Sequence, residues 1–172
     1  MKQQVDIQYY TSPCGELVLG AMGEQLCLCD WNEKACAERN RRRLIRLLDA
    51  EFVERDTDIL QRVRRELDEY FDGRRTTFSI PLYMVGTEFQ KRVWQALLEI
   101  PYGETRTYKD IALRVDNLRG VRAVAQAIGS NGISIFIPCH RVVGSDHSLT
   151  GFAGGLDAKR ILLARESGIS VR

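Results

Sequence analysis

"TYKDIALRVDNLRGVRAVAQAIG", from Thr107 to Gly129, has the pattern of two short helices within this 172-residue chain. Two helical segments, 107–115 and 119–129, flank the three residues "DNL", and Gly129 ends the second segment. Two short helices with so short a break predict a helix-turn-helix. The second helix carries Arg119 and Arg122 and no acidic residue, and its alanines and glycines let a partner approach the backbone closely.

The segments on either side extend this unit. Thr87 is a good N-cap, and apolar residues recur along one face of "EFQKRVWQALLEI" (88–100), which predicts a helix. After the helix-turn-helix, "NG" at 131–132 is a turn signal. The apolar run "ISIFI" (133–137) then predicts a short buried strand that delivers Pro138 and Cys139.

The first half of the chain has a different pattern. "ELVLGAMG" (16–23) and "QLCLCDW" (25–31) predict strands, 35–49 and 57–71 predict helices, and "TTFSIPL" (76–82) predicts a further strand. We therefore predict an α/β protein with two domains. Residues 1–84 form a small α/β domain, a few-stranded antiparallel sheet with helices, and residues 85–172 form a mostly helical, winged helix-turn-helix-like domain.

Composition and charge limit the classes of protein and of binding partner to be considered. The chain is 44% apolar and 28% charged, as in soluble globular proteins, and we expect no membrane segment and no secretory signal. Residues 1–84 contain 13 basic and 15 acidic residues, whereas residues 85–172 contain 12 and 8, so a polyanion should prefer the second half. The basic run "RNRRRLIR" (39–46) lies beside a leucine stripe; we interpret it as a solvated helix face, with a DNA contact as the alternative.

The five cysteines argue against a disulfide framework, because their number is odd and their spacing irregular. We therefore expect a reducing compartment, the cytoplasm. Four of them, Cys14, Cys27, Cys29 and Cys36, fall in the first half without a C-x-x-C pair or a nearby histidine. Buried thiols are favoured there over a zinc site, and we expect no metal and no cofactor.

Cys139 stands apart from the other four, because His140 follows it directly in "FIPCHRVVGS" (136–145). A neighbouring proton acceptor or positive charge lowers the pKa of a thiol and makes it a nucleophile. The alternative is a small apolar side chain that fills the core, as most free cysteines do. Arg141 is interpreted as structural, paired with a carboxylate beneath this loop.

Six motifs now appear in one order: "GTEFQKRVW", "IPYGETRTY", "RGVRAVAQAIGSN", "IPCHRVVG", "TGFAGG" and "LLARESG". In this order and spacing the chain resembles the O6-alkylguanine-DNA alkyltransferase family, the methylated-DNA–protein-cysteine methyltransferases. The resemblance spans nearly the whole chain and is looser before residue 85. It implies direct-reversal DNA repair, in which an alkyl group passes once and irreversibly from guanine O6 in double-stranded DNA to a cysteine.

The resemblance also implies roles for matching residues. Cys139 is then the alkyl acceptor, His140 its base through a water, and Glu166 the carboxylate that orients the imidazole. Tyr108 donates a proton to the flipped base, and Asn131 ties the DNA-binding helix to the active-site loop. Implied minor-groove contacts come from Tyr108, Arg119, Gly120, Arg122, Ala123 and Ala127, with Arg122 entering the base stack. The implied base pocket is lined by Ile128, Val142, Phe152, Ala153 and Gly154.

The chemistry itself favours a thiolate. An alkyl carbon on guanine O6 carries a poor leaving group, so displacement needs a strong, soft nucleophile, and protonation of the departing guanine helps. The product is a thioether, which offers no carbonyl for water to attack, so each molecule should act once. Base flipping is required, because O6 of a stacked guanine cannot reach a buried thiol.

Some positions depart from the family pattern. Phe152 stands where many relatives have tyrosine, which leaves stacking without a hydroxyl, and Ala153 stands where some have serine. Ser167 separates Glu166 from the glycine that usually follows it directly.

Two other functions remain as alternatives. A cysteine hydrolase would show turnover on an ester, but no oxyanion motif is evident in the sequence. A non-catalytic protein that binds alkyl lesions would lack the reactive cysteine, which is present here. The sequence leaves open the range of alkyl groups, activity on O4-alkylthymine and cooperative binding; we expect a monomer.

Overall fold

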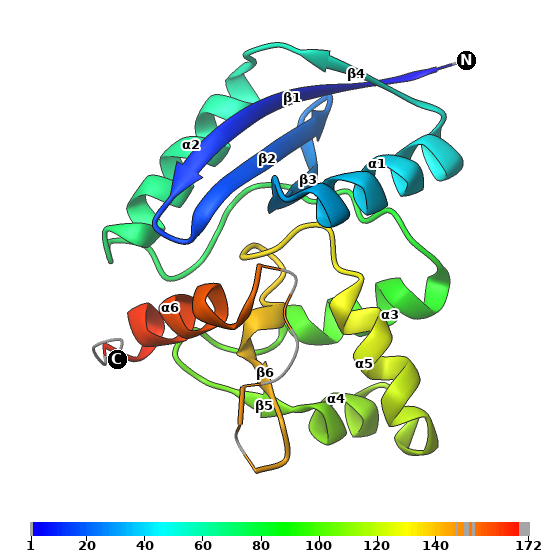
Figure 1. Cartoon of the computed structure of the whole chain (residues 1–172), viewed down its shortest axis with the longest axis vertical. Coiled ribbons are helices and arrows are strands. Elements are labelled where there is room, and N and C mark those ends of the chain that lie inside the picture. Colours follow the sequence, from blue (N-terminus) through cyan, green and yellow to red (C-terminus); the bar gives the residue numbers. More distant parts are fainter. Residues whose placement is uncertain (1, 147, 150–151, 153, 169–172) are drawn as a thin grey trace. The chain divides into compact units, whose positions relative to one another are not determined.

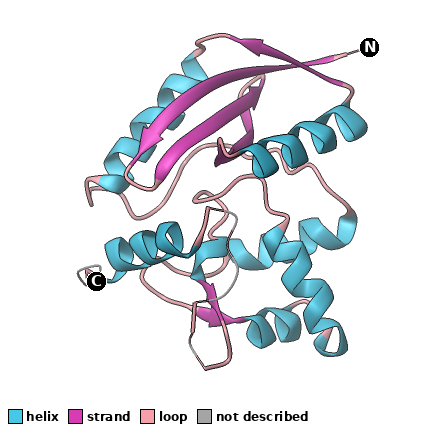
Figure 2. Ribbon diagram, in the orientation of Figure 1, coloured by secondary structure: helices cyan, strands magenta, loops and turns pink. Residues whose placement is uncertain are grey.

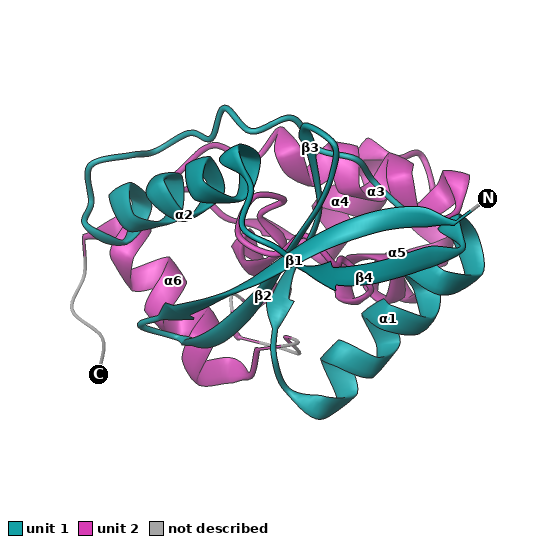
Figure 3. Ribbon diagram, turned by 90° about the horizontal axis from the view of Figure 1, so that it is seen from above, with its two compact units in different colours: residues 1–86 teal, residues 87–172 magenta. Residues whose placement is uncertain are grey.

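The computed structural model describes residues 2–146, 148–149, 152 and 154–168. The chain divides into two compact units, residues 1–86 (unit 1) and residues 87–172 (unit 2), shown in different colours in Figure 3. Each unit has its own secondary structure and core.

Unit 1 is built on a four-stranded sheet of β1 (Gln3–Ser12), β2 (Gly15–Met22), β3 (Gln25–Trp31) and β4 (Ala50–Glu54). The strand order is β3-β2-β1-β4 (Figure 1). β1 pairs with β2, and β2 with β3, in antiparallel fashion, whereas β4 pairs with β1 in parallel. The α/β fold class is confirmed, but the prediction of an antiparallel sheet was wrong at this edge. β1 was not predicted although Val5, Ile7 and Tyr9 alternate with polar residues. β4 was not predicted because it is only five residues long and its partner β1 lies more than forty residues away in the sequence.

Two helices cover the two faces of this sheet (Figure 2). α1 (Lys34–Leu48) places Leu44 in a core cluster with Val5, and α2 (Asp58–Phe71) places Asp68 against Tyr10, whose hydroxyl donates to it at 2.6 Å. Val5 and Tyr10 point to opposite faces because they are an odd number of residues apart on β1. Both helices lie within a residue of their predicted bounds.

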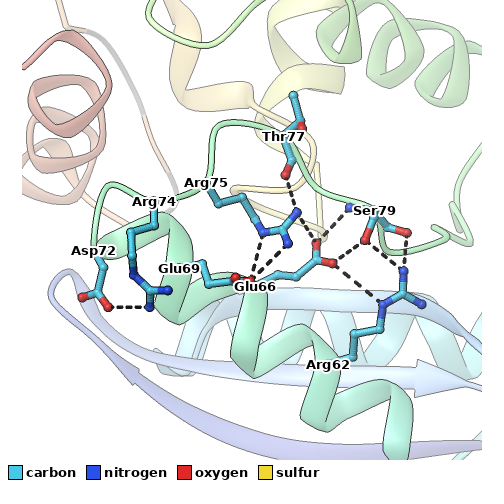
Figure 4. Close-up of polar contacts among 8 residues, drawn as sticks. All are labelled: Arg62, Glu66, Glu69, Asp72, Arg74, Arg75, Thr77 and Ser79. Atoms are coloured by element: carbon cyan, nitrogen blue, oxygen red, sulfur yellow. Dashed lines mark hydrogen bonds and ion pairs between the residues drawn. The ribbon is translucent and has the colours of Figure 1, made fainter.

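The strand predicted over 76–82 is absent from the described structure, apart from a single bridge between Leu26 and Leu82. Side chains of α2 hold this segment instead. The carboxylate of Glu66, 3% exposed, accepts from the amide and hydroxyl of Ser79, and Arg62 donates to the Ser79 carbonyl at 2.9 Å (Figure 4). The segment "TTFSIPL" is therefore held in place by hydrogen bonds to side chains of α2, and not by backbone pairing with a neighbouring strand.

Unit 2 contains four helices of more than one turn in its described residues: α3 (Glu88–Leu98), α4 (Tyr108–Arg114), α5 (Val121–Gly129) and α6 (Leu156–Ser167). A two-stranded parallel ladder joins β5 (Arg106–Thr107) to β6 (Val142–Val143), and short 3-10 turns lie at η1 (Leu118–Gly120) and η2 (Cys139–Arg141). The predicted helix-turn-helix corresponds to α4, η1 and α5. The indole of Trp94 on α3 is 2% exposed and donates to the Ala127 carbonyl at 2.8 Å, which fixes α3 against α5.

The run 133–137 is buried as predicted but does not form the predicted strand. Only Ser134 and Ile137 bridge, and Ile135 adopts the left-handed conformation with φ 74°. A β-branched residue rarely adopts this conformation, so the surrounding packing must impose it. The segment is a buried irregular loop that leads directly into η2.

Candidate active site

Cys139 begins the 3-10 turn η2 and is 7% exposed. Asn131, just after α5, holds the loop that precedes this turn. Its Nδ2 donates to the Ile137 carbonyl at 3.0 Å, and its Oδ1 accepts from the Ile133 amide at 2.9 Å. Because both bonds are buried, replacing the side chain would leave main-chain groups unpaired in the loop that carries Cys139.

His140 and Arg141 share one carboxylate, that of Glu166 on α6. His140 Nε2 lies 2.7 Å from Glu166 Oε2, and Arg141 donates from Nε to Oε1 at 2.7 Å and from Nη2 to Oε2 at 3.0 Å. All three side chains are at most 9% exposed. The predicted pairing of Arg141 with a carboxylate under the loop is confirmed, and that carboxylate is Glu166.

Arg141 also braces the turn before β5. Its Nη1 donates to the Ile100 carbonyl at 2.7 Å, and its guanidinium lies 5.8 Å from the centre of the Tyr102 ring. The bidentate bond to Glu166 and the carbonyl bond together satisfy most of its donors, as a buried guanidinium requires.

The electrostatics favour a neutral imidazole and an ionised carboxylate. Burial lowers the pKa of His140, and the charges of Arg141 and Lys159 lower it further, against the opposing effect of Glu166. Burial alone would raise the pKa of Glu166, but its bonds from His140 and Arg141 bring it below the ordinary value, to about 2. An ionised carboxylate only accepts, so Nε2 of His140 carries the proton. Nδ1 is then the basic nitrogen, and it has no hydrogen-bond partner among the described residues.

Lys159, on the first turn of α6, is a residue that the sequence analysis missed. It is 1% exposed, and its Nζ donates to the Val142 carbonyl at 2.5 Å. Burial lowers its pKa, and the charge of Cys139 raises it. The only sequence signal was a lysine four residues after "GFAGG", which does not distinguish a buried lysine from a surface one.

The residues predicted to line the base pocket fall in several places. Ile128 and Val142 are buried, whereas Phe152 and Gly154 are half-exposed; Ala153 lies outside the described residues. Tyr108 is the first residue of α4 and is half-buried. Thr107 caps this helix in a capping box with Asp110, and this fixes the position of the Tyr108 backbone at the start of α4.

Most of the predicted DNA-binding residues are exposed or half-exposed. Arg119, Arg122 and Ala123 are exposed, and Gly120 is half-exposed. A Cβ atom on Gly120 would lie 2.5 Å from the Asn117 side chain, so a larger residue would require that side chain to move. Ala127 differs, because its side chain is 4% exposed and belongs to the core.

The remaining cysteines offer no comparable site. Cys27, Cys29 and Cys36 are buried and Cys14 is half-buried, and all are free thiols. Burial raises the pKa of Cys27 to about 12 and that of Cys36 to about 11, so both are poor nucleophiles. Within the part of the chain that the structure describes, no three potential metal ligands cluster, and no helix is long and apolar enough to cross a membrane.

Comparisons with known proteins agree with this architecture. The sequence model described as "6-O-methylguanine DNA methyltransferase, ribonuclease-like domain" matches residues 7–84, and the model for the DNA binding domain of the same protein matches residues 88–168. A methylated-DNA–protein-cysteine methyltransferase of Haemophilus influenzae is 45% identical over 92% of this chain and 84% of its own length. A constitutive one of Bacillus subtilis is 38% identical over 96% and 99%.

Solved structures agree as well. A crystal structure described as Mycobacterium tuberculosis OGT in complex with DNA matches with a TM-score of 0.79 and 36% identity, over 98% of this chain and 94% of that one. Sequence and fold thus point to the same relatives over both units. The chain belongs to the 6-O-methylguanine DNA methyltransferase family.

Proposed function

We propose that this methyltransferase repairs DNA by moving an alkyl group from O6 of guanine to Sγ of Cys139, once per molecule. The observation that carries this assignment is the composition of the buried site. Cys139 precedes a histidine whose Nε2 is bound to an ionised carboxylate and whose Nδ1 is available to accept a proton. The other thiols in unit 1 have no such neighbour.

The transfer is a displacement at the alkyl carbon. Cys139 loses its proton toward His140 Nδ1 through a water, and Glu166 stabilises the positive charge as it develops on the ring. The thiolate forms the S–C bond as the C–O6 bond breaks, and guanine leaves as it gains a proton, which we assign to Tyr108. The balance needs no cofactor, and the thioether product is stable to water.

DNA binding is assigned to the face of unit 2 that carries Arg119 and Arg122. Exposed arginines beside a glycine and an alanine allow phosphate contacts and a close approach of the helix backbone to the minor groove. We assign Arg122 to the space left by the flipped base, and Asn131 to coupling α5 with the Cys139 loop through its two buried bonds. Residues 85–172 would then contain both the DNA-binding and the alkyl-acceptor functions.

We propose further that the protein acts as a monomer in the cytoplasm. Five free cysteines, most of them buried, fit a reducing compartment, where thiols persist.

Intact-protein mass spectrometry tests the assignment. The protein is mixed with excess duplex DNA that carries one O6-methylguanine, and the modified peptide is then mapped. We expect a gain of one methylene, once only and on Cys139; Cys139→Ser should gain nothing, and Cys14→Ser should behave as the unmodified chain does. Tight binding of the lesion with no gain in mass would instead make this a lesion-binding protein, and repeated turnover on an ester would indicate a hydrolase.

A further inference from the structure

A pocket with a volume of about 130 Å³ lies between α1 and the sheet of unit 1. All of its lining residues fall between Ile7 and Phe52, so the pocket belongs to unit 1 alone. In an engineered protein, a cavity of about 150 Å³ lined by apolar side chains binds benzene. The pocket in unit 1 therefore has room for the ring of one small aromatic molecule.

Most of the pocket wall is aromatic or aliphatic. Tyr9 on β1 is 43% exposed, Trp31 at the end of β3 is 5% exposed, and Phe52 on β4 is half-buried. Aliphatic side chains of the sheet complete the wall: Ile7, Val18 and Leu28. Aromatic rings pack against one another in offset or edge-to-face arrangements, so a wall with three of them favours a flat ring as the ligand.

The two charged residues that line the pocket, Asp30 and Arg41, differ in how they are paired. The Asp30 carboxylate is buried, and Arg39 and Asn40 donate to it at 3.0 and 2.8 Å. Arg41 is exposed and its guanidinium lies 5.1 Å from the centre of the Phe52 ring, and no carboxylate of the described residues pairs with it. Helix α1 has six basic residues and one acidic residue, so the potential around the pocket favours an anion.

We propose that this pocket binds a small aromatic carboxylate. Its ring lies among Tyr9, Trp31 and Phe52, and its carboxylate pairs with the guanidinium of Arg41, whose planar shape matches a carboxylate. A simple anion would leave the aromatic wall uncovered, and a neutral ring would leave Arg41 without a partner. The site lies in unit 1, so the inference goes beyond the alkyl transfer proposed for unit 2 and does not depend on it.

NMR titration of the full chain with benzoate tests the proposal. The chain has two tryptophans, Trp31 in the pocket and Trp94 in unit 2, so their indole N–H signals report on the pocket and on a control position. We expect benzoate to shift the Trp31 signal saturably and to leave the Trp94 signal unchanged. The Kd should be on the order of 1 mM, because so small a ligand makes few contacts.

Two variants separate the charge from the space. Arg41→Gln should weaken benzoate binding by about fivefold, as expected for an exposed ion pair, and should leave benzoate and the neutral benzamide with similar affinities. The matched control is Arg42→Gln on the same helix, whose side chain is 80% exposed and pairs with Glu38; it should bind benzoate as the unmodified chain does. Ala37→Leu fills the pocket from α1 and should abolish binding, while an otherwise unchanged spectrum shows that the fold is intact.

Three results would overturn the proposal. The Trp31 signal could fail to shift with benzoate, or it could shift as much with acetate, which has no ring and would indicate a bare anion contact. A single-stranded oligonucleotide that displaces benzoate would assign the pocket to nucleic acid instead. Because none of these measurements involves Cys139, they distinguish a failure of this site from a failure of alkyl transfer.

Discussion

At the scale of single residues, Glu166 binds two buried side chains of the site, those of His140 and Arg141. One carboxylate compensates a buried guanidinium and orients a buried imidazole, and its own desolvation is offset by three charged or polar bonds. Such a group is costly to remove because its partners remain buried without it.

Glu166→Gln should therefore destabilise the fold by about 3–5 kcal/mol, because Arg141 is left as an uncompensated buried charge. Urea unfolding measures this loss. The matched control is Asp157→Asn on the same helix, whose side chain is 93% exposed and pairs with Arg160; it should change stability by less than about 0.5 kcal/mol. Equal effects of the two variants would show that Arg141 does not depend on Glu166.

The same group predicts how stability depends on pH. The pKa of Glu166 in the folded chain is about 2, against an ordinary 4.5, so its stabilising contribution is present above about pH 5 and is lost as pH falls toward 2. His140, whose pKa is lowered by burial, binds its proton more readily in the unfolded chain, so it too makes the fold less stable as pH falls below its ordinary pKa of 6.5.

We therefore expect the urea midpoint to decrease steadily from pH 7 to pH 3. Between pH 7 and pH 5.5 carboxylates hardly titrate, so the decrease in urea midpoint over this range should come from His140. This decrease should be smaller in His140→Gln than in the unmodified chain. A midpoint that rises on acidification over this range would contradict a buried neutral histidine.

At the scale of elements, capping fixes where the helices of the site begin. Thr87 and Gln90 form a capping box at α3, with both reciprocal bonds present at 2.9 and 3.1 Å. α3 in turn holds α5 through Trp94 and the Ala127 carbonyl, so the start of α3 contributes to the position of the DNA-binding helix.

Thr87→Ala should cost about 1 kcal/mol of unfolding free energy, because the Gln90 amide loses its side-chain acceptor. Thr87→Ser keeps the acceptor and should lie close to the unmodified chain in the same urea titration. An alanine variant as stable as the serine variant would mean that water replaces the cap at no cost.

At the scale of the whole molecule, the two halves differ in net charge, −2 for residues 1–84 and +4 for residues 85–172. Helix α1 is also basic, although it lies in the acidic half of the chain. Two of its arginines make contacts within unit 1. Arg39 pairs with Asp30 at 3.0 Å, and Arg41 lies over the Phe52 ring at 5.1 Å. These contacts support the interpretation of α1 as a solvated face.

DNA binding should therefore depend on unit 2. Arg122→Ala should weaken binding to undamaged duplex and reduce the slope of log K against log salt by about 0.9, the value for one phosphate contact. Arg42→Ala on α1, whose side chain is 80% exposed, should leave the slope unchanged. Fluorescence anisotropy at several salt concentrations measures both, and a reversed result would place a phosphate contact on α1.

Local sequence determined much of this protein. Apolar spacing and capping residues predicted α1–α5 and two strands of the sheet, because these signals act within a few residues of one another. The motif order also predicted the family. β4 was missed because its partner β1 lies more than forty residues away in the sequence. The strands predicted over 76–82 and 133–137 did not form; the first segment is held by side chains of α2, and the second is a buried irregular loop.

Tertiary structure alone decided the charges of the site. The residues of "PCHR" identify a thiol, an imidazole and a guanidinium. The sequence does not show that one carboxylate binds both the imidazole and the guanidinium, or that Lys159 is buried beside them. Burial is what gives these groups their chemistry, since desolvation and charge pairing determine which of them are ionised. That depends on how α6 packs against η2, a contact between segments too far apart in sequence for local patterns to report.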